Sequence, residues 1–502
     1  MMRACDIPRA GTALALCALL AACGGGGGGA QHSAQSGIAT QSLRRIVWQT
    51  PVDLAPQLSA NGSLLIHYGS PVITARNAVL VPVKTGATQG FRVEARAGAS
   101  GTLIWSAASD YILPAHDWVP SFNVALTQDN RVYMPGAGGR LFVRDNPDAA
   151  TGTLQTVVFY GAAAYDAAPA TFNATVTINT PLTIDPRGNV YFGFIVTGAN
   201  PAGLASGVAR IGADGTNTWI GVRAASGNTA IAKVVTNSAP ALSPDLTTLY
   251  VAVNTSPPAP EHASGMLLAL DAQTLATRAV TDLRDPKTRA LAWVSDNGTA
   301  SPTVGPDGDV YFGVLESDTP NHNFRGWLLH YDAALREAGA AGSFGWDDTV
   351  SVVPTAMVPT YSGPAAYLLA VKYNNYADVG TGDGRNRMAI LDPRQSQADS
   401  ISPISVMREV LTILGPTAMS VPGFPGAVRE WCINTIAVDP FTNSVLVNSE
   451  DGRLYRWHLP SNQFTEQIRF NNGYAEAYTP TAIGPDGAVY AINNSTLFVV
   501  GQ

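Results

Sequence analysis

The chain has 502 residues, of which 46% are hydrophobic and 13% are charged. The charged share is about half that of ordinary soluble domains. Gly (49) and Pro (34) are plentiful, which is typical of many short strands joined by turns. The formal net charge of −7 argues against the basic surface that nucleic-acid binding requires, so no nucleic-acid partner is expected.

Residues 1–22 are predicted to be a signal peptide. Arg3 and Arg9 give a positive start, and the apolar run 10–20 is too short to span a bilayer as a stable helix. The sequence Leu-Ala-Ala-Cys at 20–23 then resembles a bacterial lipobox, in which the thiol of Cys23 is lipidated and becomes the first mature residue. An ordinary signal peptide with an incidental cysteine is the alternative.

Residues 23–41 are predicted to form a lipidated, flexible tether. A run of glycines follows Cys23 directly, and residues 30–37 are polar, so this segment cannot bury a core. An anchor carrying acyl chains such as palmitate, then a tether and a folded body, predict a membrane-held lipoprotein of the bacterial envelope. Gly24 favours the outer membrane, facing the periplasm or the cell surface. Only Cys23 and Cys432 remain after signal removal, so no intrachain disulfide is expected.

From residue 42 to residue 502 a recurring phrase indicates a repeat architecture. Each copy has a small-residue segment, a Pro-Asp-Gly-like turn and a Val-Tyr-like strand, and clear or looser copies lie at 180–191, 239–250, 301–311 and 479–490. Pro presets φ, Asp caps the turn and Gly accepts positive φ. A third strand that ends in Asp and a fourth that ends near Trp complete the unit, as in 327–332 and 344–346. Four antiparallel strands per repeat predict an all-β fold, the β-propeller.

Eight units are counted, and their first strands start near Ser70, Ser121, Thr180, Ala239, Ser301, Pro354, Asn434 and Thr479. Seven blades are the alternative, if the least regular unit near Pro354 is an insertion. The last unit lacks a fourth strand, and the Trp-bearing segment 45–49 is available to supply it. We therefore expect Trp48 to close the ring beside the C-terminal strands, which removes two exposed sheet edges.

The Asp-ending third strand, the Trp after it and the Pro-Asp-Gly turn resemble the quinoprotein alcohol dehydrogenase-like propellers, which are built from PQQ-like repeats. The resemblance covers 42–502 and implies the fold more than a function. Members that bind pyrroloquinoline quinone (PQQ) often carry adjacent cysteines and a calcium ion held by Glu and Asn beside a catalytic Asp. This chain has no adjacent cysteine pair, and the calcium set has no counterpart identified in it. Other relatives are non-catalytic envelope scaffolds, which the anchor and tether resemble more.

The two faces of the predicted propeller differ. The Pro-Asp-Gly turns share one face, the turn face, and Asp307 and Asp486 are interpreted as turn caps rather than metal ligands. The opposite face, the long-loop face, carries the loops between second and third strands together with the connections between blades. These segments are long and polar. Because loops on a rigid scaffold usually carry binding, the long-loop face is the predicted binding surface.

Candidate ligand contacts on the long-loop face are His116, Asp117, Trp118, His322, Asn323, Arg325, Tyr373, Asn375, Tyr376, Arg429 and Trp431. Each has a structural alternative. His116 and Asp117 could act as a base and its orienting carboxylate, but local hydrogen bonding is favoured. A solvated loop histidine is favoured for His322, and core packing for Trp431.

Two further interpretations concern metal and thiol chemistry. Asp378, Asp383 and Asn386 lie in a Gly-rich run that could wrap calcium, but their spacing does not match an EF-hand loop, so a hairpin tip is favoured. Trp346 is interpreted as strand packing, and Cys432 as a buried small hydrophobe.

Two functions remain open, because no nucleophile elbow, zinc helix or phosphate loop is found. The preferred hypothesis is a monomeric, non-catalytic envelope lipoprotein that binds a protein, glycan or small ligand and needs no cofactor. The alternative is a quinoprotein-like oxidoreductase that uses PQQ and calcium near the propeller axis, and it rests on the resemblance alone.

Replacing Cys23 by Ala tests the anchor. We expect metabolic labelling with palmitate to mark the wild-type protein and not the variant, because the thiol is the acyl acceptor. Cys5→Ala, within the predicted signal peptide, is the control and should leave labelling unchanged. Equal labelling of all three proteins would contradict the lipobox interpretation.

Overall fold

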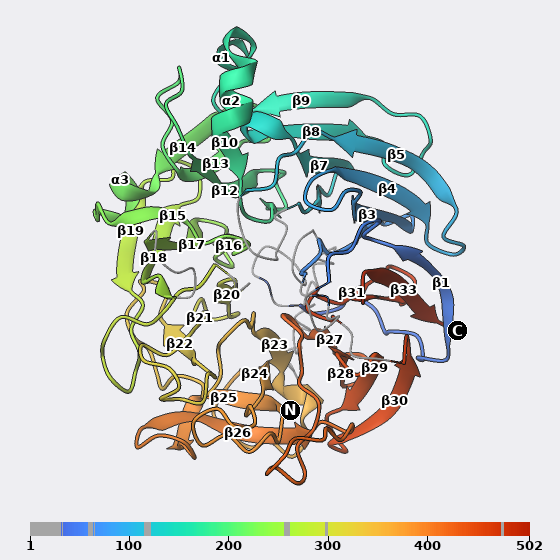
Figure 1. Cartoon of the computed structure of the whole chain (residues 1–502), viewed down its shortest axis with the longest axis vertical. Coiled ribbons are helices and arrows are strands. Elements are labelled where there is room, and N and C mark those ends of the chain that lie inside the picture. Colours follow the sequence, from blue (N-terminus) through green and yellow to red (C-terminus); the bar gives the residue numbers. More distant parts are fainter. Residues whose placement is uncertain are drawn as a thin grey trace, which may run out of the picture.

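The computed structural model describes residue 32 and residues 34–58, 64, 66–114, 122–255, 262–296, 300–472 and 476–502. These residues form eight antiparallel sheets, the blades, arranged in a ring around one axis (Figure 1). The protein is therefore an eight-bladed β-propeller, as predicted. The segment near Pro354 forms a complete blade, so the seven-blade alternative is wrong.

The strands are numbered along the chain, and within each blade they run from the axis outwards. Blades 1 and 2 consist of β2 (Val72–Ile73), β3 (Ala78–Lys84), β4 (Phe91–Ala97) and β5 (Leu103–Ser109), then β6 (Ala125–Leu126), β7 (Arg131–Pro135), β8 (Arg140–Asp145) and β9 (Leu154–Val158). In blades 3 and 4 two short segments share the innermost position. They consist of β10 (Val176–Ile178), β11 (Thr183–Ile184), β12 (Val190–Val196), β13 (Gly207–Ile211) and β14 (Asn217–Gly221), then β15 (Ile231–Val234), β16 (Ala241–Leu242), β17 (Thr248–Thr255), β18 (Gly265–Asp271) and β19 (Thr277–Asp282).

The second half of the ring contains blades 5 to 8. Blades 5 and 6 consist of β20 (Thr303–Val304), β21 (Val310–Val314) and β22 (Trp327–Tyr331), then β23 (Ser351–Pro354), β24 (Tyr367–Tyr373), β25 (Arg387–Ala398) and β26 (Ser405–Leu414). Blades 7 and 8 consist of β27 (Ala437–Asp439), β28 (Ser444–Ser449), β29 (Arg453–His458) and β30 (Gln463–Arg469), then β31 (Ala482–Ile483), β32 (Val489–Asn493), β33 (Thr496–Gly501) and β1 (Arg45–Pro51).

The recurring Pro-Asp-Gly turn caps itself as predicted. Asp307 Oδ1 accepts the backbone N–H of Asp309 at 3.1 Å, and Asp486 Oδ1 accepts that of Ala488 at 3.0 Å. Gly487 has φ +80°, a left-handed conformation that glycine adopts without strain. The capping interpretation of both aspartates is confirmed.

Hydroxyl groups of the recurring phrase join neighbouring blades around the axis. Thr183 Oγ1 donates to the carbonyl of Pro240 at 2.5 Å, and Thr303 Oγ1 donates to that of Val350 at 2.9 Å. Ser351 Oγ in blade 6 likewise donates to a carbonyl of blade 7. These groups are buried, so each bond also satisfies polar atoms that would otherwise be costly in the core. Ser and Thr recur at these positions because their hydroxyl groups form hydrogen bonds to the neighbouring blade.

The ring is closed by the two ends of the chain, as predicted. Strand β1 is the outermost strand of blade 8 and pairs antiparallel with β33, with Trp48 opposite Val499. Trp48 Nε1 donates to the carbonyl of Gly98 in blade 1 at 2.6 Å, and its ring meets Tyr490 edge-on at 6.5 Å. The closing strand therefore contacts both blades at the seam.

Residues 34–41, predicted as the end of the tether, lie against the blades. Gln35 forms a parallel bridge with Val438 of the innermost strand of blade 7. The backbone N–H of Thr40 donates to Asp439 Oδ2 at 2.9 Å, and the backbone N–H of Gln41 donates to the carbonyl of Gly487. The folded body thus begins before residue 42.

Blade 5 completes its outer edge in an unusual way. Tyr331 and Leu328 form isolated bridges with Glu337 and Gly342, and the backbone N–H of Met407 in β26 donates to the carbonyl of Ala341. The long β25–β26 hairpin of blade 6 therefore covers blade 5. Residues 344–346 form no strand, so the interpretation of Trp346 as strand packing is wrong.

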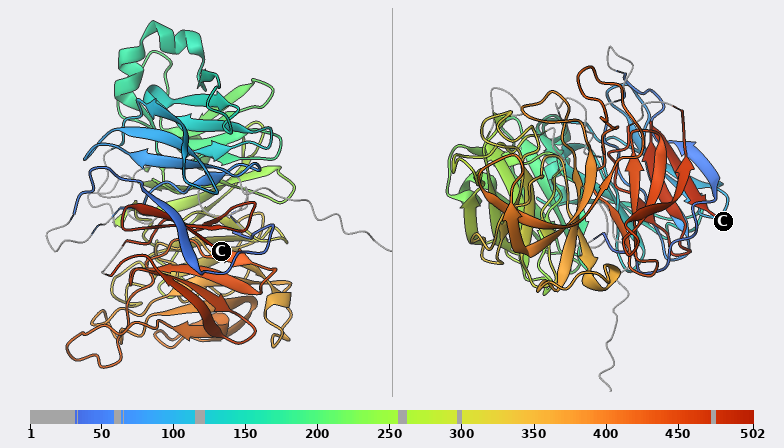
Figure 2. Two further views of the ribbon diagram at one scale, coloured as in Figure 1. Left: turned by 90° about the vertical axis from the view of Figure 1, so that its right-hand side faces the viewer. Right: turned by 90° about the horizontal axis from the view of Figure 1, so that it is seen from below.

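Helices are few and short among the described residues: α1 (Ala162–Ala167), α2 (Pro169–Thr175), α3 (Val222–Ser226), and the 3-10 turns η1 (Ala137–Gly139) and η3 (Thr355–Met357). The first two project together from one edge of the ring (Figure 2). None of the helices in the described ranges has the length and apolar character needed to cross a membrane.

Trp48→Ala tests ring closure. We expect it to lower the free energy of unfolding by roughly 2–4 kcal/mol, because it removes packing and a hydrogen bond at the seam. Leu103→Ala, in the exposed outermost strand of blade 1, is the control and should have a much smaller effect. Denaturant unfolding monitored by circular dichroism measures both. Equal effects would contradict a special role for the closing strand.

Candidate functional site

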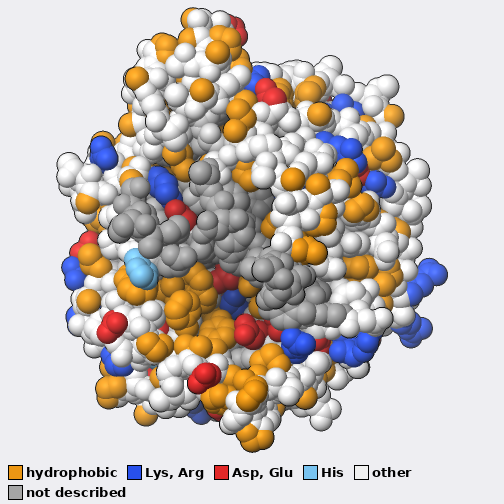
Figure 3. All heavy atoms as spheres, viewed as in Figure 1, with side chains coloured by type: hydrophobic (Ala, Val, Ile, Leu, Met, Phe, Trp, Pro, Cys, Tyr) orange, Lys and Arg blue, Asp and Glu red, His pale blue; other side chains and the backbone are white. Residues whose placement is uncertain are grey.

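A pocket of about 400 Å³ opens near the propeller axis on the long-loop face. Figure 3 shows acidic and basic side chains at the bottom of this hollow, with hydrophobic side chains beside them. Loops of blades 5 and 6 supply part of its walls. The connections from blade 5 to blade 6, from blade 6 to blade 7 and from blade 7 to blade 8 supply the rest. The described lining residues are Phe324, Trp346, Asp347, Lys372, Asn374, Tyr376, Ala377, Val379, Met419, Val421, Glu430, Trp431, Cys432 and Tyr478.

The connection between blades 5 and 6 brings Trp346 and Asp347 to the pocket. A Cβ on Gly313 would lie 2.0 Å from the carbonyl of Gly345, so only glycine lets this connection cross β21 closely. The ammonium group of Lys372, near the end of β24, lies 3.4 Å from Asp347 Oδ2. Both side chains of this ion pair are at most 5% exposed, so the pair is strongly constrained by its surroundings.

The next connection, between blades 6 and 7, carries Glu430 and Cys432. The backbone N–H of Glu430 donates to Glu450 Oε1 at 3.1 Å, and the Cys432 thiol donates to Glu450 Oε2 at 3.2 Å. One ligand atom from each of these three residues lies within 4.8 Å of the others, a set that could hold a metal ion. Cys432 is buried as predicted, and its thiol contacts the carboxylates of Glu430 and Glu450.

The connection between blades 7 and 8 adds Glu476 and Tyr478. The backbone N–H of Tyr478 donates to Glu476 Oε1 at 2.8 Å. The ring of His67, from the connection that enters blade 1, lies 4.0 Å from that of Tyr478. Burial lowers the pKa of His67 to about 4, although the nearby Asp347 opposes this. The imidazole is therefore neutral at physiological pH.

Carboxylates outnumber the cations that act on them at this site. Burial, and then the charge of Glu450, raises the pKa of Glu430 to about 7. Burial raises the pKa of Glu476 and of Asp348 well above the ordinary range, and the charge of Asp347 adds to both. The charged form of each of these carboxyl groups is therefore disfavoured, because burial removes the water that would stabilise the anion.

The thiol follows the same rule. Burial, and then the charges of Glu450 and Glu430, raises the pKa of Cys432 well above the ordinary value. The thiolate form that a nucleophile or a redox-active cysteine needs is therefore disfavoured. In this setting Cys432 is a hydrogen-bond donor rather than a reactive group.

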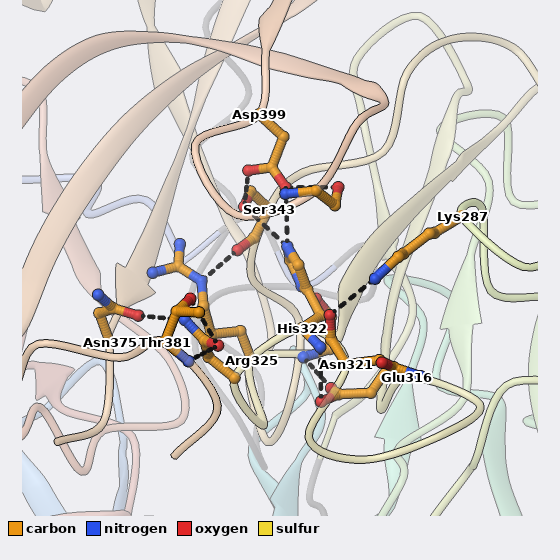
Figure 4. Close-up of polar contacts among 12 residues, drawn as sticks. Lys287, Glu316, Asn321, His322, Arg325, Ser343, Asn375, Thr381 and Asp399 are labelled. Atoms are coloured by element: carbon orange, nitrogen blue, oxygen red, sulfur yellow. Dashed lines mark hydrogen bonds and ion pairs between the residues drawn. The ribbon is translucent and has the colours of Figure 1, made fainter. Parts of the chain in front are cut away.

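The predicted candidate His322 lies away from the pocket and is fully buried (Figure 4). Its Nδ1 lies 2.9 Å from the carbonyl of Gly326, and its Nε2 lies 3.2 Å from both Asp399 Oδ2 and Ser343 Oγ. The ring also stacks on Trp327 at 3.6 Å. The favoured interpretation, a solvated loop histidine, is wrong because the β25–β26 hairpin covers this loop.

Ser343, His322 and Asp399 are the residue types of a hydrolase triad, but their geometry differs. The Ser343 hydroxyl donates to Asp399 Oδ1 at 2.8 Å, and the serine and the aspartate share the same nitrogen of His322. Burial alone would raise the pKa of Asp399, but hydrogen bonds from His322, Ser402 and Ser343 outweigh it and hold this pKa below the ordinary value. The arrangement locks the hairpin and activates no nucleophile.

Other predicted residues also hold loops together. Arg325 is buried, donates to the carbonyls of Ser343 and Asn374 at 2.8 Å each, and lies 4.3 Å from the ring centroid of Tyr373. Asn323 donates to Asn375 Oδ1 at 3.0 Å. These contacts fix the loops of blades 5 and 6 against each other.

The weak calcium candidates make internal hydrogen bonds. Asn386 Oδ1 accepts the backbone N–H of Asn375 at 2.9 Å, and its amide donates to the carbonyl of Val428 at 2.8 Å. Asp383 Oδ1 accepts from the side chain of Asn375 at 2.7 Å. Asp378 has φ +63° at the loop tip. These hydrogen bonds agree with the favoured interpretation of this segment as a hairpin tip.

Two of the predicted contacts, Tyr376 and Trp431, line the axial pocket. Arg429 directly precedes the lining residue Glu430 in the sequence. His116, Asp117, Trp118 and Cys23 lie outside the described residues. Sequence reasoning missed Lys372, Glu430, Glu450, Glu476 and Tyr478 as site residues. A lysine inside the buried, β-forming strand β24 was a usable signal, since such a strand rarely buries an unpaired charge.

The fold is similar to that of a europium-containing methanol dehydrogenase, with a TM-score of 0.53 and 11% identity over 92% of this chain and 87% of that chain. It is also similar to the quinohemoprotein alcohol dehydrogenase from Comamonas testosteroni, with a TM-score of 0.50 and 14% identity over 94% and 80% of the two chains. For BamB from Moraxella catarrhalis the TM-score is 0.44, with 13% identity over 91% and 99%. The methanol and alcohol dehydrogenase structures thus share the β-propeller fold of this chain.

At such identities the similarity shows the fold alone, as the sequence resemblance predicted. No protein-family model matches the chain, and no curated protein matches it.

The pocket does not fit PQQ, the cofactor that the fold resemblance implies. PQQ is a polycarboxylate, whereas Asp347 and Glu430 line the pocket, and Glu450 contacts Glu430 and Cys432. Cys432 has Trp431 and Ile433 as its sequence neighbours, so it has no adjacent cysteine. Bringing further carboxylates next to these buried acids would add repulsion in a region of low dielectric constant.

Glu430→Gln tests the electrostatics of the site. The raised pKa means that the folded state binds a proton more tightly than the unfolded state, so stability falls as the pH rises from about 4.5 to about 7. This single group accounts for about 3 kcal/mol over that interval. We expect the variant to match the wild type at pH 4.5 and to be more stable at pH 7.5.

Urea unfolding at the two pH values measures this difference. The groups that act on Glu430 are Glu450, Lys372 and Arg429. Glu337→Gln, in an exposed ion pair with Arg289, is the matched control. If the free energy of unfolding of Glu430→Gln depends on pH as that of the wild type does, the Glu430 carboxyl group is not the source of this dependence.

Proposed function

We propose that this protein is a lipid-anchored binding module of the bacterial cell envelope that holds its ligand in the axial pocket of the long-loop face and performs no chemistry of its own. The observation that carries the proposal is the convergence of blade loops and connections on one polar pocket near the axis. A rigid ring that presents one such pocket matches the usual anatomy of ligand sites.

The chemistry of the site supports binding rather than catalysis. Cys432 is held as a thiol, His67 is neutral with its ring tilted against that of Tyr478, and the Ser343 hydroxyl donates a hydrogen bond to Asp399. The alternative, a quinoprotein-like oxidoreductase, conflicts with the carboxylates around the pocket. The proposal therefore excludes PQQ as the natural ligand.

The anchor is consistent with this role. His32 Nδ1 lies 2.7 Å from the carbonyl of Pro302 in blade 5, so the chain is held to the propeller from that residue. The segment from Cys23 to His32 spans at most about 32 Å when fully extended. Acylation of Cys23 would therefore keep the propeller close to the membrane surface and to envelope components there.

Site-specific photo-crosslinking in the native envelope tests the binding role. A photoreactive amino acid replaces Pro422, which is exposed at the pocket rim beside Val421, or Asp214, which is exposed in a hairpin turn on the other face. We expect an adduct, detected by mass spectrometry, from position 422 and none from position 214. The added substitution Ala377→Trp, which fills the pocket, should abolish the adduct.

Two outcomes would contradict the proposal. One is an adduct at position 422 that persists when Ala377→Trp fills the pocket, since binding would then occur elsewhere. The other is reproducible dye-linked oxidation of an alcohol or sugar by the purified protein supplied with PQQ and calcium, since the module would then be an enzyme.

A further inference from the structure

We propose that the axial pocket recognises a small organic cation through its alkylammonium group, which is held between carboxylates and aromatic rings. This inference rests on the proposed binding role of the pocket and adds the chemical class of the ligand. It reverses the charge of the ligand that the fold resemblance implies.

The first argument is the local excess of carboxyl groups over the cations that act on them. Asp347 is paired with Lys372, but within the described ranges no lysine, arginine or histidine forms an ion pair with Glu430, which lines the pocket. Lys372 and Arg429 act on Glu430 only at longer range. A carboxyl group at a pocket wall that lies close to a second carboxyl group, as that of Glu430 does to that of Glu450, is best satisfied by a cation from solution.

The second argument is the aromatic lining, which an inorganic ion would not use. Phe324, Trp346, Tyr376 and Tyr478 all line the pocket, and Phe324 meets Trp346 edge-on at 6.2 Å. Ring faces attract ammonium groups, most strongly where water is excluded. The Lys372 ammonium already lies 5.8 Å from the ring centroid of Tyr478, so the site accommodates this type of contact.

The third argument is size and apolar surface. A volume of about 400 Å³ suits a small molecule and far exceeds the needs of a bare metal ion. Val379, Met419 and Val421 provide apolar walls that suit an alkyl body. Carboxylates on one side, with rings and aliphatic groups around them, match the polar head and alkyl body of an alkylammonium ion.

Isothermal titration of the full-length protein at pH 7.5 tests this inference with three probes: choline, tetramethylammonium and butylammonium. We expect at least one probe to bind, and its uncharged isostere, 3,3-dimethylbutan-1-ol in the case of choline, to bind at least tenfold more weakly. Glu430→Gln and Trp346→Leu should each lower the affinity for the cation at least tenfold. Glu337→Gln, exposed and remote, should leave its affinity unchanged.

Circular dichroism establishes that each variant is folded, and Glu430→Gln is nearly isosteric. Equal affinity for the cation and its uncharged isostere would overturn the inference, because charge would play no part. Binding of calcium or zinc that is lost in Glu430→Gln and Cys432→Ser but kept in Trp346→Leu would overturn it in favour of a metal site.

Failure of all three probes to bind would also overturn the inference. The binding role of the pocket would then stand or fall separately on the photo-crosslinks at position 422 and their loss in Ala377→Trp. The two proposals are therefore distinguishable by experiment.

Discussion

Closure of the ring is the constraint on which the rest of the structure depends. Each blade has two apolar faces and is stabilised only when both are covered, and the core lies between neighbouring sheets. At the seam Val79 and Val81 of blade 1 pack with Tyr490 and Val499 of blade 8. Strand β1 holds this seam by joining the first strand of the chain to the last. Buried hydroxyl–carbonyl bonds between innermost strands then keep several blades at a fixed spacing around the axis.

That fixed spacing determines what happens at the centre of the long-loop face. The connections from blades 5, 6 and 7 converge on the axis because their strands do, and they bring Asp347, Glu430 and Glu476 together with the loop residue Glu450. Burying so many carboxylates is unfavourable for the isolated fold, which is why their pKa values rise. A rigid propeller can tolerate such a site, and strained electrostatics of this kind are typical of places where function rather than stability governs the choice of residues.

The loops around the pocket are held by a second layer of buried polar contacts. Glu316 is fully buried and its carboxylate accepts backbone N–H groups of His322, Phe324 and Gly326. The β25–β26 hairpin locks the same loop from outside through Asp399. The result is that Phe324 is presented to the pocket from a loop with little freedom. Preorganisation of this kind reduces the entropy lost on binding.

Much of the architecture was predictable from local pattern. The recurring phrase, the Pro-Asp-Gly turns and the Trp-bearing strand near residue 48 predicted eight blades, the capping role of Asp307 and the closing strand, because each depends on residues close in sequence or on a period. The division into a turn face and a long-loop face followed from the same topology. The sequence also pointed to Tyr376 and Trp431, which line the pocket of the long-loop face, and the lipobox-like segment at Cys23 remains a prediction from sequence alone.

Only the tertiary structure decided which polar residues share the pocket. Glu430, Glu450 and Glu476 are separated along the chain, and their proximity comes from the radial convergence of different blades. The burial of His322 was equally non-local, because the hairpin of the next blade covers its loop and Asp399 of that hairpin contacts its ring. A sequence determines local turns and strand periods directly, whereas a cluster of carboxyl groups at an axis is assembled from distant segments and exists only once the ring has closed.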